Sequence, residues 1–263
     1  MYRKVVDFHA HAFHDKIAEK AAQNLNTYYS IPLAGNGMFH VLLDSMQKNH
    51  IDKLVIHATA TKPAQVQVIN DYVSGLITKD IIGFGTLHRD YEHNEEELER
   101  IVSLGLCGIK FHPVFQGFKI DDEKMMPVYQ RIAELGLPVL MHMGDKNCDY
   151  VTPSRLAAVL DKIPDLTVIA AHMGGFSEWQ EAEKHLYGRR NVYLDTSSSI
   201  RFLEPEETKR LIYAHGVDRV LFGTDYPLAL HQEELENIDR IGLTEKEAEQ
   251  ILWKNAYALL NLS

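Results

Sequence analysis

The chain has 263 residues, of which 45% are hydrophobic, and a formal net charge of −10. This length allows a sizeable buried core in one large domain or two small ones, and the acidic balance argues against a nucleic-acid partner. Two cysteines, Cys107 and Cys148, are too few for a disulfide framework or a thiolate zinc site. Because no apolar leader and no run of about 18 apolar residues occurs, we expect a cytoplasmic protein without membrane contact.

Eight short apolar runs follow one another along the chain. Each has the length and the β-branched or large apolar residues of a buried strand, and several are apolar on both faces, as parallel strands covered by helices are. The runs span residues 4–9, 53–58, 81–88, 106–112, 138–143, 166–173, 191–197 and 218–225.

Segments with helical spacing separate these runs. Residues 152–164 begin with Thr152 as an N-cap and Pro153 at the first helical position, and residues 244–260 begin with a capping box of Thr244 and Glu247. The other predicted helices span residues 38–50, 95–105, 121–136, 177–188 and 203–216.

This alternation of strand and helix signals predicts parallel βαβ units. Eight units in about 250 residues predict a (β/α)8 TIM barrel that forms one domain over residues 1–263. An open doubly wound sheet is the alternative, but the chain has neither GxGxxG nor GxxxxGK[ST]. The longest connection, residues 12–36, is expected to form a lid over the active face or, alternatively, a surface excursion on the barrel rim.

Histidines concentrate where predicted strands end, and the carboxyl ends of barrel strands carry the active site. Strand side chains alternate, so His9 and His11 point the same way and Asp7 shares their face. The two imidazoles can supply two ligands of a metal site, and His142 and Asp225 are candidates for the remaining ligands. The alternative for each of the four is a hydrogen-bonded polar residue at the barrel rim. Seven of the 14 histidines lie at the ends of predicted strands 1 to 6: His9, His11, His57, His88, His112, His142 and His172.

Five sequence blocks carry a resemblance to a known family. They are DFHAH (7–11), GIKFHP (108–113), VLMHMG (139–144), AHMGG (171–175) and LFGTDYP (221–227). In this order they resemble the amidohydrolase superfamily, and more closely its amidohydrolase-related group of aminocarboxymuconate-semialdehyde decarboxylase-like barrels. The resemblance implies one divalent metal on His9, His11, His142 and Asp225, with His172 beside the metal-bound water or substrate. It also agrees with the lack of residues for a β-sandwich domain.

The implied ligands suit zinc, with manganese, iron and cobalt as alternatives. A bound ion lowers the pKa of its water to roughly 7, so Asp225 would take a proton from that water and His172 would orient it or stabilise an oxyanion. Lys110 is expected to hold a substrate anion, or to bridge two metals if carboxylated; we favour one metal. His112 is a substrate contact or alternative ligand, and Arg89 would bind a substrate carboxylate unless it is a surface arginine.

Three functions fit these residues. The first is hydrolysis of a C–N, ester or lactone bond of a small molecule, the second is non-oxidative decarboxylation, and the third is a non-catalytic sensor barrel, against which the complete ligand set argues. Because the predicted lid contains no arginine and only Lys16 and Lys20, we favour hydrolysis. The apolar stretch at residues 28–35 would suit a homodimer contact.

Overall fold

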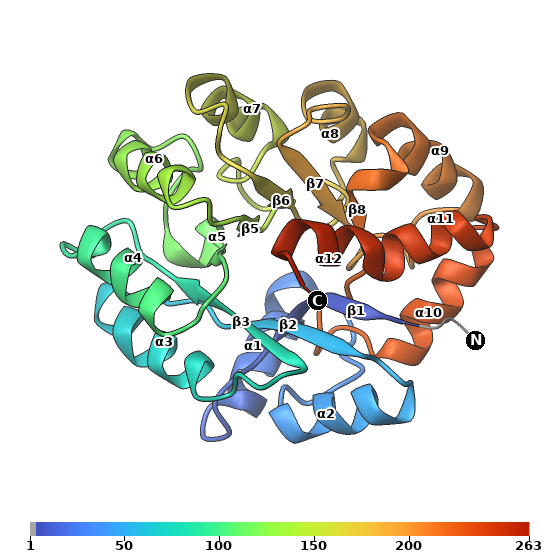
Figure 1. Ribbon diagram of the computed structural model, residues 1–263, viewed down its shortest axis with the longest axis horizontal. Helices are drawn as coiled ribbons and strands as arrows, with labels where there is room; N and C mark the ends of the chain where they lie inside the picture. The colour runs from blue at the N-terminus through green and yellow to red at the C-terminus, as the bar shows by residue number, and fades with distance from the viewer. Residues whose placement is uncertain (1–3, 263) are drawn as a thin grey trace. The chain divides into compact units, whose positions relative to one another are not determined.

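The computed structural model describes residues 4–262. Eight strands form one sheet in which the order of the strands follows the chain, β1 to β8 (Figure 1). Parallel pairing joins β1 to β2 and each strand from β3 to β7 to the next. Every strand overlaps a predicted run: β1 (Val6–His11), β2 (Lys53–His57), β3 (Ile81–Thr86), β4 (Ile109–Phe111), β5 (Val139–Met141), β6 (Val168–Ala170), β7 (Val192–Asp195) and β8 (Val220–Leu221).

Helices separate the strands, as the sequence predicts. The predicted ones are found as α2 (Phe39–Lys48), α4 (Asn94–Ser103), α6 (Met126–Glu134), α7 (Pro153–Lys162), α8 (Trp179–His185), α9 (Pro205–His215), and α11 (Glu245–Glu249) continuing through a π-helical stretch (Gln250–Lys254) into α12 (Asn255–Leu260). Four were not predicted: α1 (Ala18–Tyr29), α3 (Val66–Ser74), α5 (Pro113–Gln116) and α10 (His231–Arg240). Within residues 4–262, no helix combines the length and apolarity needed to cross a membrane.

The chain divides into two compact units, each described by itself below. Of the described residues, unit 1 comprises 4–57, 78–82 and 196–262, and unit 2 comprises 58–77 and 83–195. Unit 1 thus contains β1, β2 and β8, and unit 2 contains β4 to β7. The prediction of one domain over the whole chain stays a prediction.

In unit 1, backbone hydrogen bonds hold the carboxyl end of β1 from both sides. On one side, His11 is in register with His57, the last residue of β2. On the other, the N–H of Asp225 donates to the carbonyl of His9 (2.7 Å) and the N–H of His11 donates to the carbonyl of Tyr226 (3.0 Å). These backbone contacts therefore bring His9, His11, His57 and Asp225 close together in unit 1.

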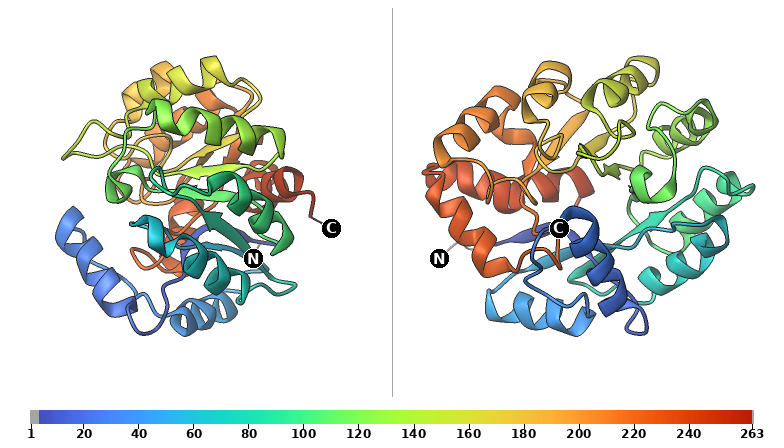
Figure 2. Two further views of the ribbon diagram at one scale, coloured as in Figure 1. Left: turned by 90° about the vertical axis from the view of Figure 1, so that its left-hand side faces the viewer. Right: turned by 180° about the vertical axis from the view of Figure 1, so that it is seen from behind.

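The connection over residues 12–36 is tied to the segment after β8. The N–H groups of Ala34 and Gly35 donate to the carbonyl of Pro227 (3.1 and 3.0 Å), and the Tyr226 hydroxyl donates to the carbonyl of Met38 (2.7 Å). A Cβ at Gly35 would lie 2.4 Å from the Tyr226 ring, so this approach requires glycine. Instead of an irregular loop, the connection contains α1, dark blue in Figure 2. Its function as a lid stays a prediction.

In unit 2, the register of the strands aligns their carboxyl ends. Phe111 of β4 pairs with Met141 of β5, and Met141 pairs with Ala170 of β6. The residues that follow β4 and β5 are His112 and His142, which therefore emerge side by side.

Candidate metal centre

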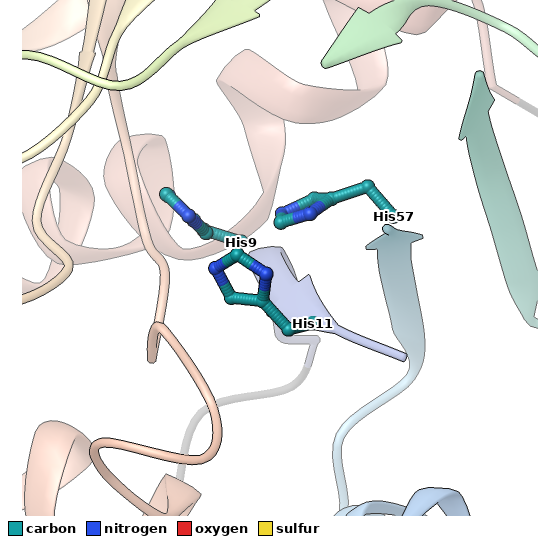
Figure 3. A group of neighbouring side chains, drawn as sticks. All are labelled: His9, His11 and His57. Carbon is teal, nitrogen blue, oxygen red and sulfur yellow. The ribbon is translucent and has the colours of Figure 1, made fainter. Parts of the chain in front are cut away.

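Three imidazoles gather at the end of β1 in unit 1. The centroids of the His9, His11 and His57 rings lie 4.5–5.6 Å from one another, and each ring offers a nitrogen within 4.8 Å of those of the other two. Figure 3 shows the three rings turned toward a common space. All three side chains are buried. Sequence reasoning placed His57 at a strand end but did not include it in the ligand set; its register with His11 is the signal that joins it to this cluster.

A carboxylate oxygen faces two of these rings. Oδ1 of Asp225 lies 3.4 Å from Nε2 of His9 and 3.2 Å from Nε2 of His11. Ligand atoms about 2.1 Å from a tetrahedral ion lie about 3.4 Å from one another, so these three atoms fit a shared divalent cation. Two imidazole nitrogens and one carboxylate oxygen are also donors that zinc and manganese accept. The structure thus brings together three of the four predicted ligands.

The backbone of Asp225 has a φ of +57°. Left-handed backbone is uncommon for residues other than glycine and is found at functional sites where the surroundings hold it in place. Here the surroundings include Asp7, whose Oδ1 accepts hydrogen bonds from the N–H groups of His9 and Thr224 (both 3.0 Å) and whose Oδ2 accepts one from the Thr224 hydroxyl (2.6 Å). Asp7 therefore connects β1 to the segment that carries Asp225.

Two serines contact the outer atoms of the same cluster. The Ser197 hydroxyl oxygen lies 3.1 Å from Nδ1 of His9, and the Ser198 hydroxyl donates to Oδ2 of Asp225 at 2.6 Å. The candidate residues of the sequence analysis did not include these serines. Their contacts depend on a turn that no local sequence pattern revealed.

Unit 2 holds a second group of histidines, with a different arrangement. The rings of His112 and His142 are stacked, with centroids 3.8 Å apart and planes 11° apart, and Phe115 stacks on the other side of His112 at 4.1 Å and 20°. Nε2 of His172 lies 3.0 Å from Nδ1 of His142. Asp195 accepts a hydrogen bond from the backbone N–H of His172 (3.0 Å). The ligand role of His142 and the catalytic role of His172 stay predictions.

The remaining predicted residues also lie in unit 2. Lys110 on β4 is completely buried. Burial is the main cause that lowers the pKa of His88. Arg89 pairs with Asp90 at 2.7 Å and with Asp122 at 3.4 Å, and the hydrogen bond to Asp90 is the main cause that raises the pKa of Arg89. These two carboxylates would compete with a substrate carboxylate for Arg89, whose role in binding stays a prediction.

Comparison with known proteins adds a family match and two curated relatives. The family profile Amidohydro_2, described as Amidohydrolase, matches residues 6–262. The chain is 25% identical to the 2-amino-3-carboxymuconate-6-semialdehyde decarboxylase of Dictyostelium discoideum, over 74% of this chain and 66% of that protein. It is 24% identical to the Gamma-resorcylate decarboxylase of Polaromonas sp. (strain JS666), over 74% of this chain and 75% of that protein. The chain thus spans just under two thirds of the length of the first relative.

Similar solved structures extend over nearly the whole chain. An uncharacterised TIM-barrel protein of Bordetella bronchiseptica has a TM-score of 0.81 at 22% identity, and the match covers 98% of this chain and 99% of that chain. A dihydroxybenzoic acid decarboxylase of Polaromonas sp. JS666 with bound manganese has a TM-score of 0.74 at 18% identity (98% and 97% covered). A candidate 2-pyrone-4,6-dicarboxylic acid hydrolase of Pseudomonas putida has a TM-score of 0.67 at 18% identity (100% and 99% covered). These similarities confirm the predicted fold class.

Proposed function

Since the chain belongs to the amidohydrolase family, we propose that it is a metal-dependent decarboxylase of a small aromatic or unsaturated carboxylic acid. The observation that carries the metal requirement is the approach of Oδ1 of Asp225 to Nε2 of both His9 and His11. The two curated relatives are both decarboxylases, and they favour this reaction over the hydrolysis that the sequence analysis preferred. The structural neighbours include a candidate hydrolase as well as a decarboxylase, so the choice of reaction rests on the two curated relatives.

The charge of the ligand set supports an acidic substrate. We place a divalent cation on His9, His11 and Asp225, with His142 as the fourth ligand predicted from the sequence. When bound, this cation would act as a Lewis acid toward substrate oxygens. Neutral imidazoles add no charge and Asp225 adds one negative charge, so a net charge of about +1 remains to attract a carboxylate. Manganese and zinc are the two metals that we propose to test first.

The reaction itself needs one proton transfer. The bond between the substrate carbon and its carboxylate breaks, CO₂ leaves without the bonding electron pair, and the carbon takes up a proton in its place. We assign this proton transfer to His172, because an imidazole can give and take a proton near neutral pH. Asp225 would remain a carboxylate that holds the metal through Oδ1.

Two residues of unit 2 are our proposed substrate contacts. His112 belongs to a stack with Phe115 and His142, which suits the flat ring or conjugated chain of the proposed acid. Lys110 would offer a cation to the carboxylate.

A homodimer through residues 28–35 is retained as a proposal that measurement of the molecular mass in solution would test.

The test of the reaction class is the measurement of both products on purified full-length protein. The protein is loaded with Mn²⁺ or Zn²⁺ and given small hydroxybenzoates, unsaturated carboxylic acids, lactones and amides in water enriched in ¹⁸O. We expect one CO₂ per molecule of acid consumed, loss of activity after chelation and recovery when metal is restored. Turnover of a lactone or amide with ¹⁸O in the product and no CO₂ would instead establish hydrolysis.

A further inference from the structure

We propose that Ser197 and Ser198 are positioning residues that set which atoms of His9 and Asp225 face the metal. This inference rests on the metal centre of the proposed function. Both serines are buried in unit 1, in the turn that follows β7. Each hydroxyl contacts a different predicted ligand, and each contact is made on the side of the ligand that faces away from the shared position.

Ser197 acts on the tautomer of His9. A neutral imidazole has one N–H group and one nitrogen with a lone pair, and only the latter can bind a metal. Nε2 of His9 lies near Oδ1 of Asp225, whereas Nδ1 lies 3.1 Å from the Ser197 hydroxyl. If Ser197 accepts a hydrogen bond from Nδ1–H, the lone pair is fixed on Nε2, the nitrogen that faces Asp225. Partners of this kind determine the orientation and tautomer of metal-binding histidines.

Ser198 acts on the orientation of the Asp225 carboxylate. Its hydroxyl donates to Oδ2 at 2.6 Å, a length typical of a charge-assisted hydrogen bond. Oδ1 is then the oxygen directed at His9 and His11. Because Oδ2 is bound to the serine, Asp225 would coordinate through one oxygen instead of two.

The backbone of the turn is built to bring the two hydroxyls to these positions. The N–H of Thr196 donates to the carbonyl of Leu221 (3.0 Å), and the N–H of Gly223 donates to the Thr196 hydroxyl (3.2 Å), so the turn is tied to β8. A Cβ at Gly223 would lie 2.9 Å from the Cβ of His9 and 3.3 Å from that of Ser197. The missing side chain thus lets Ser197 approach His9.

Ser198 also has a left-handed backbone, with a φ of +47°. Glycine would adopt this conformation without steric hindrance, and asparagine more easily than most residues. A serine here is explained by its hydroxyl, which reaches Asp225 from this backbone conformation.

The test uses the full-length protein stripped of metal, with Co²⁺ as the probe and no substrate. Affinity is measured by titration, and the visible spectrum of Co²⁺ reports the number and type of ligands. For Ser197→Ala and Ser198→Ala we expect a roughly 10- to 100-fold weaker affinity and, for Ser198→Ala, a changed spectrum because Oδ2 of Asp225 is released. The matched control is Thr208→Ala, which removes a buried hydroxyl that donates to the carbonyl of Glu204, the residue before α9 (3.1 Å); it should bind Co²⁺ like the wild type.

Two further variants separate positioning from folding. Ser197→Thr keeps a hydroxyl and should recover the affinity. Ser198→Gly relieves the backbone but lacks the hydroxyl, so it should bind as weakly as Ser198→Ala. Wild-type affinity and spectrum in both Ser198→Ala and Ser198→Gly would overturn the role of Ser198, and wild-type affinity in Ser197→Ala would overturn that of Ser197.

The same measurements distinguish this inference from the proposed reaction. One possible result is that the wild type binds Co²⁺, the serine variants bind it more weakly, and no acid releases CO₂. This result would contradict the proposed decarboxylase activity but support the positioning role of the two serines. A wild-type protein that binds no divalent metal would contradict both.

Discussion

The two histidine groups use the same side chain in different ways. In unit 1 the ring planes are inclined to one another by 47–79°, and nitrogens of His9 and His11 face a carboxylate oxygen. In unit 2 the His112 and His142 planes are almost parallel, and the stack continues with Phe115. Converging nitrogens suit a cation, whereas stacked faces suit a flat organic molecule.

The strands explain this difference. His9 and His11 come from one strand, two residues apart, so alternation sends both to the same side. His112 and His142 follow two neighbouring strands whose last residues are in register, so their rings lie face to face. The number of histidines is therefore a weaker guide to a metal site than the strand positions from which they come.

The largest predicted effect is the loss of metal from the unit 1 group. We expect His11→Ala and Asp225→Asn to weaken metal binding by more than the roughly 100-fold that results from losing a hydrogen-bond partner of a ligand. His11→Ala removes a donor atom of the site, and Asp225→Asn removes its negative charge. His112→Ala is the matched control and should keep its metal. The metal content after dialysis, measured by mass spectrometry, gives the answer; the comparison fails if His112→Ala loses its metal and His11→Ala retains it.

The second prediction compares a buried asparagine in each unit. In unit 2, the Asn70 side chain accepts from the N–H of Thr86 (2.7 Å) and donates to its carbonyl (3.0 Å) and to Oε1 of Glu97 (2.7 Å). In unit 1, the Asn255 side chain donates to the carbonyls of Val217 and Val220 (2.8 and 2.7 Å).

Removing either side chain leaves buried polar groups without partners. Asn70→Ala should lower the free energy of unfolding by about 3 kcal/mol and Asn255→Ala by about 2 kcal/mol, because Asn70 also serves a carboxylate. Urea unfolding monitored by circular dichroism measures both. A larger loss for Asn255→Ala than for Asn70→Ala would show that the unit 1 contacts dominate.

The third prediction concerns the pH dependence of stability in unit 1. Glu234 on α10 is buried, and this burial raises its pKa from 4.5 to about 8, against the opposing effects of Arg201 and the Asn237 side chain. The folded state therefore holds this proton more tightly than the unfolded state. Between about pH 4.5 and pH 8, stability should fall as pH rises, with a slope from this group of at most about 1.4 kcal/mol per pH unit.

Glu234→Gln should remove this part of the slope, and the exposed Glu236→Gln on the same helix should leave it unchanged. Urea unfolding at several pH values from 5 to 8 provides the measurement. Equal slopes in the wild type and Glu234→Gln would show that Glu234 does not hold its proton in the folded protein.

The smallest predicted effect concerns the stacked rings of unit 2. An aromatic pair contributes about 0.5–1.5 kcal/mol beyond the area it buries, so His112→Ala should weaken binding of an aromatic acid by roughly 2- to 10-fold. Binding of the acid to metal-loaded protein is measured by calorimetry, with an aliphatic acid as the control ligand. Equal losses for both acids would contradict a role for the stack.

The sequence predicted the strands well and the helices less completely. All eight strands produce apolar runs, but α10 buries His231, Glu234 and Ile238, of which one is apolar, so no apolar stripe marked it. The segment Val66–Ser74 is rich in β-branched residues, which masked α3. Such helices depend on tertiary packing that local patterns do not contain.

The candidate site was likewise predicted only in part from the sequence. Strand parity and motif resemblance were enough to choose His9, His11 and Asp225. The contacts of Ser197 and Ser198 depend on a positive φ and on the missing side chain of Gly223, which become visible only in three dimensions.

The most direct test of the metal centre is a crystal structure of the metal-loaded protein with anomalous data collected at the absorption edges of manganese and zinc. We predict a single strong peak about 2.1 Å from Nε2 of His9, Nε2 of His11 and Oδ1 of Asp225. A peak within coordination distance of the unit 2 histidines alone would contradict the proposed metal centre. So would the absence of a peak in crystals of protein that binds the metal in solution.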